Sequence, residues 1–186
     1  MTELRDDVLD EAGQRSKYLT ARELLSLVER HHPHEGAGVD RETFEAYAEG
    51  VADRTARSTD EFTGPLSDGL TTSDRWGGGE AVYDLGDDRI SVYPRHWHET
   101  LGGVTDPREH LQFLLGEVDD YGKSVPESTL LHLVTVVGGV GYDEAKATLE
   151  TLREEGAVVE DADQHPDANV YLSEEDAGLA DDKDVQ

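Results

Sequence analysis

Residues 89–98 read Arg-Ile-Ser-Val-Tyr-Pro-Arg-His-Trp-His and contain no acidic side chain. This run is the largest local departure in a chain with 43 acidic and 16 basic residues. Guanidinium groups can pair with phosphate oxygens, and an aromatic ring such as that of Trp97 can pack beneath them. The run therefore predicts a DNA contact through Arg89 and Arg95. The alternative is that both arginines pair with neighbouring acids and that Trp97 belongs to the core.

Three further arginines extend this prediction. Arg54 and Arg57 are about one helical turn apart at the end of a segment with helical periodicity. Arg75 precedes two short runs, residues 80–85 and 89–93, that are rich in aromatic and β-branched side chains. The predicted DNA-binding residues are therefore Arg54, Arg57, Arg75, Arg89 and Arg95. Their predicted partner is double-stranded DNA.

Two histidine clusters, residues 31–35 and 96–99, could in principle bind a metal. Imidazole and carboxylate groups at short spacing bind zinc or nickel. Neither cluster has the i, i+4 spacing of a His-Glu-x-x-His helix, and Pro33 interrupts the first one. The favoured interpretation is a polar helix end and a loop after a strand, so we predict no metal site.

The sequence contains no motif of a catalytic or cofactor-binding site. Glycines 77–79 are not followed by the lysine and helix of a P-loop, and residues 138–141 lack the preceding strand of a dinucleotide-binding site. The serines show no nucleophile-elbow pattern, and the absence of cysteine excludes thiolate chemistry. We therefore expect a protein without catalytic activity and without a cofactor.

The formal charge of -27 has three interpretations: a disordered acidic chain, an acidic mimic of nucleic acid, or adaptation to molar salt. Periodic apolar blocks argue against disorder. In about 1 M salt the Debye length is about 3 Å, so repulsion between surface carboxylates is largely screened. Twelve arginines, four lysines and acids along every segment resemble the composition of haloarchaeal proteins. With no apolar run of about 18 residues, a cytoplasmic protein without membrane contact is expected.

The first half of the chain predicts three helices. Thr20 and Glu23 have the spacing of a capping box, in which each side chain satisfies a backbone N–H group, and the helix should end near residues 31–33. Asp40 is a favourable N-cap for a second helix with an amphipathic apolar face. Residues 58–61 could cap a third, shorter helix.

A β-hairpin is predicted after these helices. Residues 64–79 have the composition of a loop, with room for one more helical turn. Residues 80–85 and 89–93 are the predicted strands, because both are short runs rich in aromatic and β-branched residues. Gly86, Asp87 and Asp88 supply the turn between them.

The second half repeats this order of elements. Asp106 and Pro107 predict an N-cap and first helical position, and residues 124–127 have capping-box spacing for a second helix. A third helix is predicted over residues 142–152, and Gly156 suits the position just after its end. The strands of the second hairpin are predicted at residues 157–160 and 169–172.

The end of that third helix carries a resemblance to a known family. Residues 149–159 read Leu-Glu-Thr-Leu-Arg-Glu-Glu-Gly-Ala-Val-Val, a helix that leads directly into a strand. The stretch 125–172 resembles the winged-helix domains of archaeal transcription regulators and of the carboxy-terminal extensions of replicative helicases. The first half matches on element order alone. The resemblance implies a third helix in the DNA major groove and a wing that contacts phosphates.

The outward face of the helix at residues 142–155 is poorly suited to that role. Its acidic positions are Asp143, Glu144, Glu150 and Glu154, against two basic residues. Each acid near a phosphate opposes the release of counterions that drives nonspecific binding. We therefore predict that the second unit contacts a protein partner or forms a homodimer, with Lys146, Glu150 and Arg153 as partner-binding residues.

The sequence thus predicts an α+β, predominantly helical fold with two winged-helix-like units of three helices and a hairpin each. The expected function is DNA-binding transcription regulation without catalysis. The alternative is an adaptor in a replication or transcription assembly that does not itself contact DNA. Arginines joined in one positive patch would favour DNA, and arginines each paired to an acid would favour the adaptor. The predicted domains are an N-terminal helical extension (1–19), the first unit (20–101), the second unit (104–172) and a disordered acidic tail (173–186).

Overall fold

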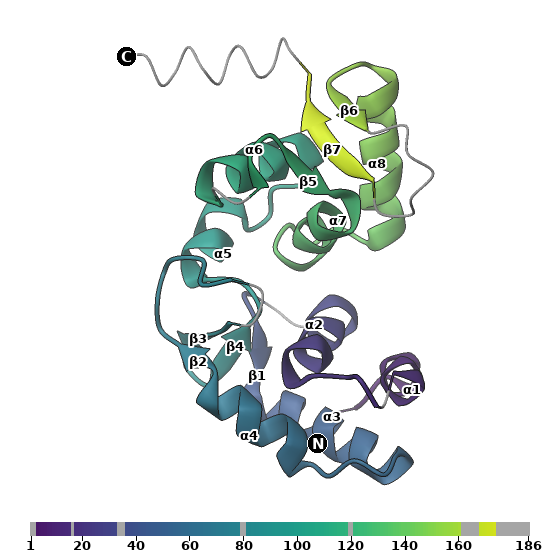
Figure 1. Cartoon of the computed structure of the whole chain (residues 1–186), viewed down its shortest axis with the longest axis vertical. Helices are drawn as coiled ribbons and strands as arrows, with labels where there is room; N and C mark the ends of the chain where they lie inside the picture. Colours follow the sequence, from purple (N-terminus) through teal and green to yellow (C-terminus); the bar gives the residue numbers. More distant parts are fainter. Residues whose placement is uncertain are drawn as a thin grey trace. The chain divides into compact units, whose positions relative to one another are not determined.

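The computed structural model describes residues 3–15, 17–32, 36–78, 81–118, 121–160 and 168–173. These residues form eight helices and seven short strands, which confirms the predicted α+β, predominantly helical class. The chain divides into two compact units, Met1–Thr100 and Leu101–Gln186 (Figure 1). The predicted acidic tail, apart from Ser173, lies outside the described residues.

The first unit begins with four helices: α1 (Asp6–Gln14), α2 (Ala21–His31), α3 (Arg41–Arg54) and α4 (Asp60–Asp68). The predicted capping box at the start of α2 is confirmed, because Thr20 Oγ accepts a hydrogen bond from Glu23 N at 3.1 Å and Glu23 Oε2 accepts one from Thr20 N at 2.9 Å. Helix α1 lies within the segment predicted as an N-terminal helical extension. It packs on α2 and α3 through its buried apolar face.

Helix α4 differs from the sequence prediction. It continues through Gly64 and Pro65, which were assigned to a loop. Proline inside a helix removes one backbone hydrogen bond. Phe62 and Leu66, four residues apart, are both buried, and their packing holds the helical turn across the proline.

The first unit contains a four-stranded sheet in the order β1-β4-β3-β2. Strands β3 (Val82–Gly86) and β4 (Arg89–Ser91) form the predicted antiparallel hairpin. Asp87 and Asp88 in its turn have φ values of 55° and 60°, the left-handed conformation that tight hairpin turns require. Two strands were not predicted: β1 (Val39–Asp40), which pairs antiparallel with β4, and β2 (Leu70–Thr71), which pairs parallel with β3.

The basic run 89–98 is divided between a strand and a helix. Strand β4 ends at Ser91, and helix α5 (Arg95–Leu101) occupies the segment that was expected to be a loop. Trp97 is 1% exposed and stacks on Trp76 with the ring centroids 4.9 Å apart. Trp97 is therefore a core residue, as the alternative interpretation expected, and it anchors α5.

The second unit consists of α6 (Pro107–Glu117), β5 (Ser124–Pro126), α7 (Glu127–Val136), α8 (Tyr142–Glu154), β6 (Val158–Glu160) and β7 (Asn169–Leu172). The predicted cap of α6 is confirmed, since Asp106 Oδ1 accepts a hydrogen bond from Arg108 N at 2.9 Å. The predicted capping box before α7 is wrong. Ser124 lies in β5 opposite Tyr171, and α7 begins after Pro126 without a side-chain cap.

The two units share one order of elements. In each, a helix, a short strand, two helices and a hairpin follow one another, and the short strand pairs with the last strand of the hairpin. The series is α2-β1-α3-α4-β3-β4 in the first unit, where the additional strand β2 lies between α4 and β3, and α6-β5-α7-α8-β6-β7 in the second. None of the helices in the described segments combines the length and the apolarity that a membrane span requires.

Candidate functional site

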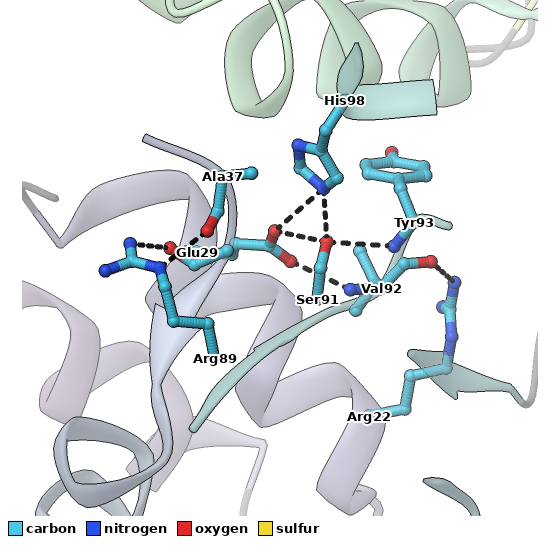
Figure 2. Close-up of polar contacts among 9 residues, drawn as sticks. Arg22, Glu29, Ala37, Arg89, Ser91, Val92, Tyr93 and His98 are labelled. Carbon is cyan, nitrogen blue, oxygen red and sulfur yellow. Dashed lines mark hydrogen bonds and ion pairs between the residues drawn. The ribbon is translucent and has the colours of Figure 1, made fainter. Parts of the chain in front are cut away.

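A buried polar cluster joins three elements of the first unit (Figure 2). Glu29 comes from the last turn of α2, Ser91 from the end of β4 and His98 from α5. Their exposed fractions are 2%, 0% and 8%. Buried polar side chains are costly unless they are hydrogen-bonded, so the geometry of this cluster decides what it can do.

The Ser91 hydroxyl is the centre of the cluster. Ser91 Oγ lies 2.5 Å from Glu29 Oε2 and 2.8 Å from His98 Nε2, and it accepts a hydrogen bond from Tyr93 N at 3.0 Å. Glu29 Oε1 accepts a hydrogen bond from Val92 N at 2.9 Å. His98 Nε2 is 3.9 Å from Glu29 Oε2. A single carboxyl group thus ties α2 to both the backbone and the side chain at the end of β4.

Burial controls the protonation of Glu29. Removal from water raises the pKa of its carboxyl group to about 7, because the charged form is poorly solvated. Hydrogen bonds from Ser91 and Val92 and the positive charges of Arg22 and Arg89 oppose this rise without cancelling it. The carboxyl group therefore exchanges its proton near neutral pH.

Serine, histidine and a carboxylate occur together here, but they are not arranged as a nucleophilic triad. In such a triad the carboxylate holds the imidazole through the nitrogen remote from the serine. Here the Glu29 carboxyl group is hydrogen-bonded to Ser91 itself. Ser91 Oγ and Glu29 Oε2 both approach the same nitrogen of His98, Nε2. Ser91 is also fully buried. The cluster can share a proton and connect elements, but its hydroxyl is not placed to attack a substrate.

The predicted DNA-binding arginines of α3 and its C-terminal end contact acids of the same unit. Arg54 pairs with Asp6 at 3.0 Å and with Asp10 at 2.7 Å, so it joins α3 to α1. Arg57 pairs with Glu61 at 3.2 Å and donates a hydrogen bond to the backbone carbonyl oxygen of Leu19 at 3.0 Å. Its guanidinium also lies 4.6 Å from the centroid of the Phe62 ring.

Arg89 and Arg95 also have partners within the unit. Arg89 donates hydrogen bonds to the carbonyl oxygens of Ala37 at 2.7 Å and Gly38 at 2.8 Å, and its Nη1 is 3.5 Å from Asp40 Oδ1. Arg95 donates a hydrogen bond to the carbonyl oxygen of Leu85. The two arginines and His98 line one hollow of about 380 Å³, together with acidic residues.

The acidic residues that line this hollow are Asp87 and Glu99.

Arg75 lies apart on the exposed segment after β2, where its backbone N donates to Ser73 Oγ at 3.1 Å. The structure therefore brings Arg89 and Arg95 to one hollow, and it commits Arg54 and Arg57 to contacts made by α1, α4 and the segment before α2.

In the second unit, the predicted partner-binding cations of α8 also form internal ion pairs. Lys146 Nζ is 3.7 Å from Glu127 Oε1, and Arg153 Nη1 is 3.0 Å from Glu160 Oε2. Glu150 is exposed between them. The exposed acids of α8 and its C-cap are Asp143, Glu144, Glu150, Glu154 and Glu155. Since both cations are engaged with neighbouring elements, the outward surface of α8 is acidic.

Glu127 is a second carboxyl group with a raised pKa, and Glu160 contributes to the shift. Burial is the main reason that the pKa of Glu127 rises to about 7, and the hydrogen bond and negative charge of Glu160 raise it further. The charges of Lys146 and Arg153 act in the opposite direction.

We predict that Glu160→Gln lowers the pKa of Glu127 below 7, because the substitution removes a negative charge and supplies an amide donor to the carboxylate. A titration followed by the ¹³Cδ resonance of Glu127 checks this shift. Glu150→Gln, on the exposed face of α8, is the control and should leave the titration unchanged. An unaltered pKa of Glu127 in Glu160→Gln would contradict the effect of Glu160 described here.

A described histidine of each cluster contacts other side chains of the first unit. His32 Nδ1 is 2.7 Å from the Tyr47 hydroxyl, and His98 belongs to the buried cluster. Residues 33–35 of the first cluster lie outside the described residues. Within the described parts of the chain, no three histidine or carboxylate groups are grouped so that they could hold a metal ion.

Glu29 and Ser91 were not predicted as members of a site. One signal was present, since Glu29 is four residues after Leu25 and so lies on the apolar face of α2. Comparison of the chain with models of known protein families, with curated proteins and with solved structures gives no match.

Proposed function

We propose that the chain is a non-catalytic protein-interaction adaptor built from two winged-helix modules. The order helix, strand, helix, helix, hairpin in both units supports the winged-helix assignment, as does the pairing of the first strand with the last. A cytoplasmic location belongs to the same proposal, in line with the acidic composition.

One observation carries the choice of an adaptor over a DNA-binding protein. Arg54, Arg57 and Arg89 pair with carboxylates of their own unit, and Arg95 donates to a backbone carbonyl oxygen. To contact phosphates these side chains would first have to leave partners inside the fold. The arginines therefore serve the structure of the first unit.

The elements that would approach DNA in a winged helix are also acidic. Helix α4, the third helix of the first unit's series, contains Asp60, Glu61 and Asp68 and no basic residue. The tip of the β3–β4 hairpin carries exposed Asp87 and Asp88. Negative charge at these positions repels phosphates and suits a partner with a basic surface.

DNA binding is the competing proposal, and one observation favours it. Arg89 and Arg95 line the same hollow beside the hairpin, so their positive charges lie in one place. In this proposal both side chains would exchange their internal partners for phosphate oxygens.

Titration of labelled DNA duplexes at several KCl concentrations, followed by fluorescence anisotropy, tests the adaptor proposal. We expect no saturable binding for specific or random duplexes between about 0.2 M and about 3 M KCl. The Arg89→Ala/Arg95→Ala double variant and the control Arg15→Ala, which pairs with Glu11 on α1, should behave like the unaltered protein. Binding that weakens with salt, and by a further 1–3 kcal/mol or so in the double variant alone, would support DNA contact instead.

A second arm of the experiment tests the partner surface. A protein that the unaltered chain captures should not be captured by the Glu150→Lys/Glu154→Lys double variant, because the two substitutions reverse the charge of the exposed face of α8. Glu45→Lys, on the exposed face of α3, is the matched control. Equal capture by both variants would show that α8 is not the surface used.

A further inference from the structure

The Ser91 hydroxyl sets a rule for protons in the buried cluster. A hydroxyl oxygen donates one hydrogen bond and accepts two. Ser91 Oγ has three neighbours at hydrogen-bond distance, namely Glu29 Oε2, His98 Nε2 and Tyr93 N. Tyr93 N is a backbone N–H group and can only donate. The other two neighbours must therefore be one donor and one acceptor.

Two arrangements satisfy this rule. In the first, Ser91 donates to the Glu29 carboxylate and accepts a hydrogen bond from His98 Nε2. In the second, the carboxyl group of Glu29 is protonated and donates to Ser91, which donates in turn to His98 Nε2; the imidazole is then neutral and carries its proton on Nδ1. Both arrangements satisfy the Ser91 hydroxyl. The cluster can therefore accept the proton that Glu29 binds near neutral pH by reversing the direction of its hydrogen bonds, while the imidazole proton moves from Nε2 to Nδ1.

Protonation of both groups breaks the rule. Glu29, His98 and Tyr93 would then direct three donors at an oxygen with two lone pairs, and the Ser91 hydrogen would lose its acceptor. Buried donors without acceptors are unfavourable. The contact that gives way is the one on the least anchored element, and α5 is a helix of seven residues whereas Glu29 is also held by Val92 N.

We propose that Glu29, Ser91 and His98 form a proton-counting latch. The latch holds α5 to α2 and β4 while either Glu29 or His98 donates a hydrogen bond to Ser91. It loosens α5 when both donate.

Charged groups from each neighbouring element act on this latch. Arg22 of α2 and Arg89 of β4 place positive charge near the Glu29 carboxyl group. Around His98, the hollow is lined by Arg95 and Glu99 of α5 and by Asp87 of the hairpin turn. The carboxylates of Asp87 and Glu99 favour a positive charge on the imidazole of His98. Arg89 and Arg95, which line the same hollow, oppose that charge.

Loosening of α5 does not mean its release. Trp97 is buried against Trp76 and Tyr93, with ring centroids 4.9 Å and 5.6 Å away. The latch therefore controls how often the backbone of α5 opens, while the aromatic stack keeps the helix in place. Helix α5 includes the boundary between the two units, at Thr100 and Leu101.

Hydrogen exchange of the backbone amides of α5, measured by NMR on the full chain in molar KCl, tests the latch. After correction for the intrinsic effect of pH, the protection of α5 should stay level near neutral pH. It should fall about tenfold as acidification adds the second proton to the cluster, as expected for the loss of one hydrogen bond. The amides of α3 should show no such step.

Three variants make the test specific. Ser91→Ala removes the central oxygen, so α5 should be weakly protected at every pH and show no step. His98→Gln keeps a group that can either donate or accept by turning its amide, so α5 should remain protected throughout the range. Ser67→Ala, on the exposed face of α4, is the matched control and should keep the step of the unaltered protein.

The His98→Gln variant keeps the proposal falsifiable if Ser91→Ala does not fold. An acid-induced step of the same size in His98→Gln would overturn the latch. Equal protection of α5 at all pH values in the unaltered protein would overturn it as well.

Discussion

Gly138→Ala is expected to destabilise the second unit by about 3 kcal/mol or more, the upper end of the cost of overpacking a core. A Cβ atom at position 138 would lie 2.5 Å from the carbonyl oxygen of Val104, nearer still to that of Val134, and 3.2 Å from His110 Nε2. The two carbonyl groups belong to the backbone and cannot turn aside. Glycine is therefore required here by close packing.

The neighbouring His110 increases the cost. It is fully buried, its Nε2 lies 2.7 Å from the carbonyl oxygen of Val104, and burial lowers its pKa. Displacing Val104 to make room for a methyl group would break this hydrogen bond inside the core.

Hydrogen exchange of the α7 amides, combined with urea unfolding followed by circular dichroism, measures the effect of Gly138→Ala. Gly116→Ala is the control, because a Cβ at that position in α6 meets no atom within 4 Å. This control should be neutral or stabilise the chain by up to about 1 kcal/mol. If both variants unfolded alike, the close approach at Gly138 would be wrong.

Glu29→Gln is expected to change how stability depends on pH. The pKa of Glu29 in the folded chain is about 7, against an ordinary value of 4.5. Between these values the folded state holds a proton that the unfolded state has lost, so Glu29 stabilises the fold most below pH 4.5. That contribution disappears as the pH rises through about 7, and the total change is on the order of 3 kcal/mol.

Glutamine at position 29 resembles the protonated carboxyl group. Its amide can donate to Ser91 while its oxygen accepts from Val92 N, and it does not titrate. Relative to the unaltered protein, Glu29→Gln should therefore gain stability as the pH rises from 5 to 8. Urea unfolding in molar KCl at several pH values measures this difference, with Glu45→Gln on the exposed face of α3 as the control. Parallel pH profiles of Glu29→Gln and the unaltered protein would contradict the buried carboxyl group described here.

The helices were predictable where caps and periodicity coincide. Thr20 and Glu23 mark the start of α2, and Asp106 and Pro107 mark the start of α6, because side chains at these positions satisfy backbone groups that the helix itself leaves unpaired. The β3–β4 hairpin follows from its turn residues Gly86, Asp87 and Asp88, and the strands of both hairpins follow from short runs of β-branched and aromatic residues. These signals are local, so the sequence alone reveals them.

The missed elements depend on contacts between distant segments. Strands β1 and β2 have two residues each and exist because they pair with the hairpin. Ser124 and Glu127 have the spacing of a capping box, but pairing of Ser124 with Tyr171 places the serine in a strand instead. Pairing across a sheet therefore overrides the local pattern in each case.

The buried cluster was missed for a similar reason. A glutamate on the apolar face of a helix is visible in the sequence, but its partners Ser91 and His98 come from elements more than 60 residues away. The arginines between residues 54 and 95 were identified as candidate DNA contacts from the sequence alone. Their internal partners, such as Ala37 and Asp10, could be identified only from the fold.

The most direct test of the proposed adaptor is an NMR titration that follows the side-chain N–H signals of Arg54, Arg57, Arg89 and Arg95 as DNA duplex is added. The account predicts that these signals stay at the positions set by their internal partners at every DNA concentration. Saturable shifts of Arg89 and Arg95, absent for Arg15, would show that the arginines leave those partners for phosphate, and this result would contradict the account.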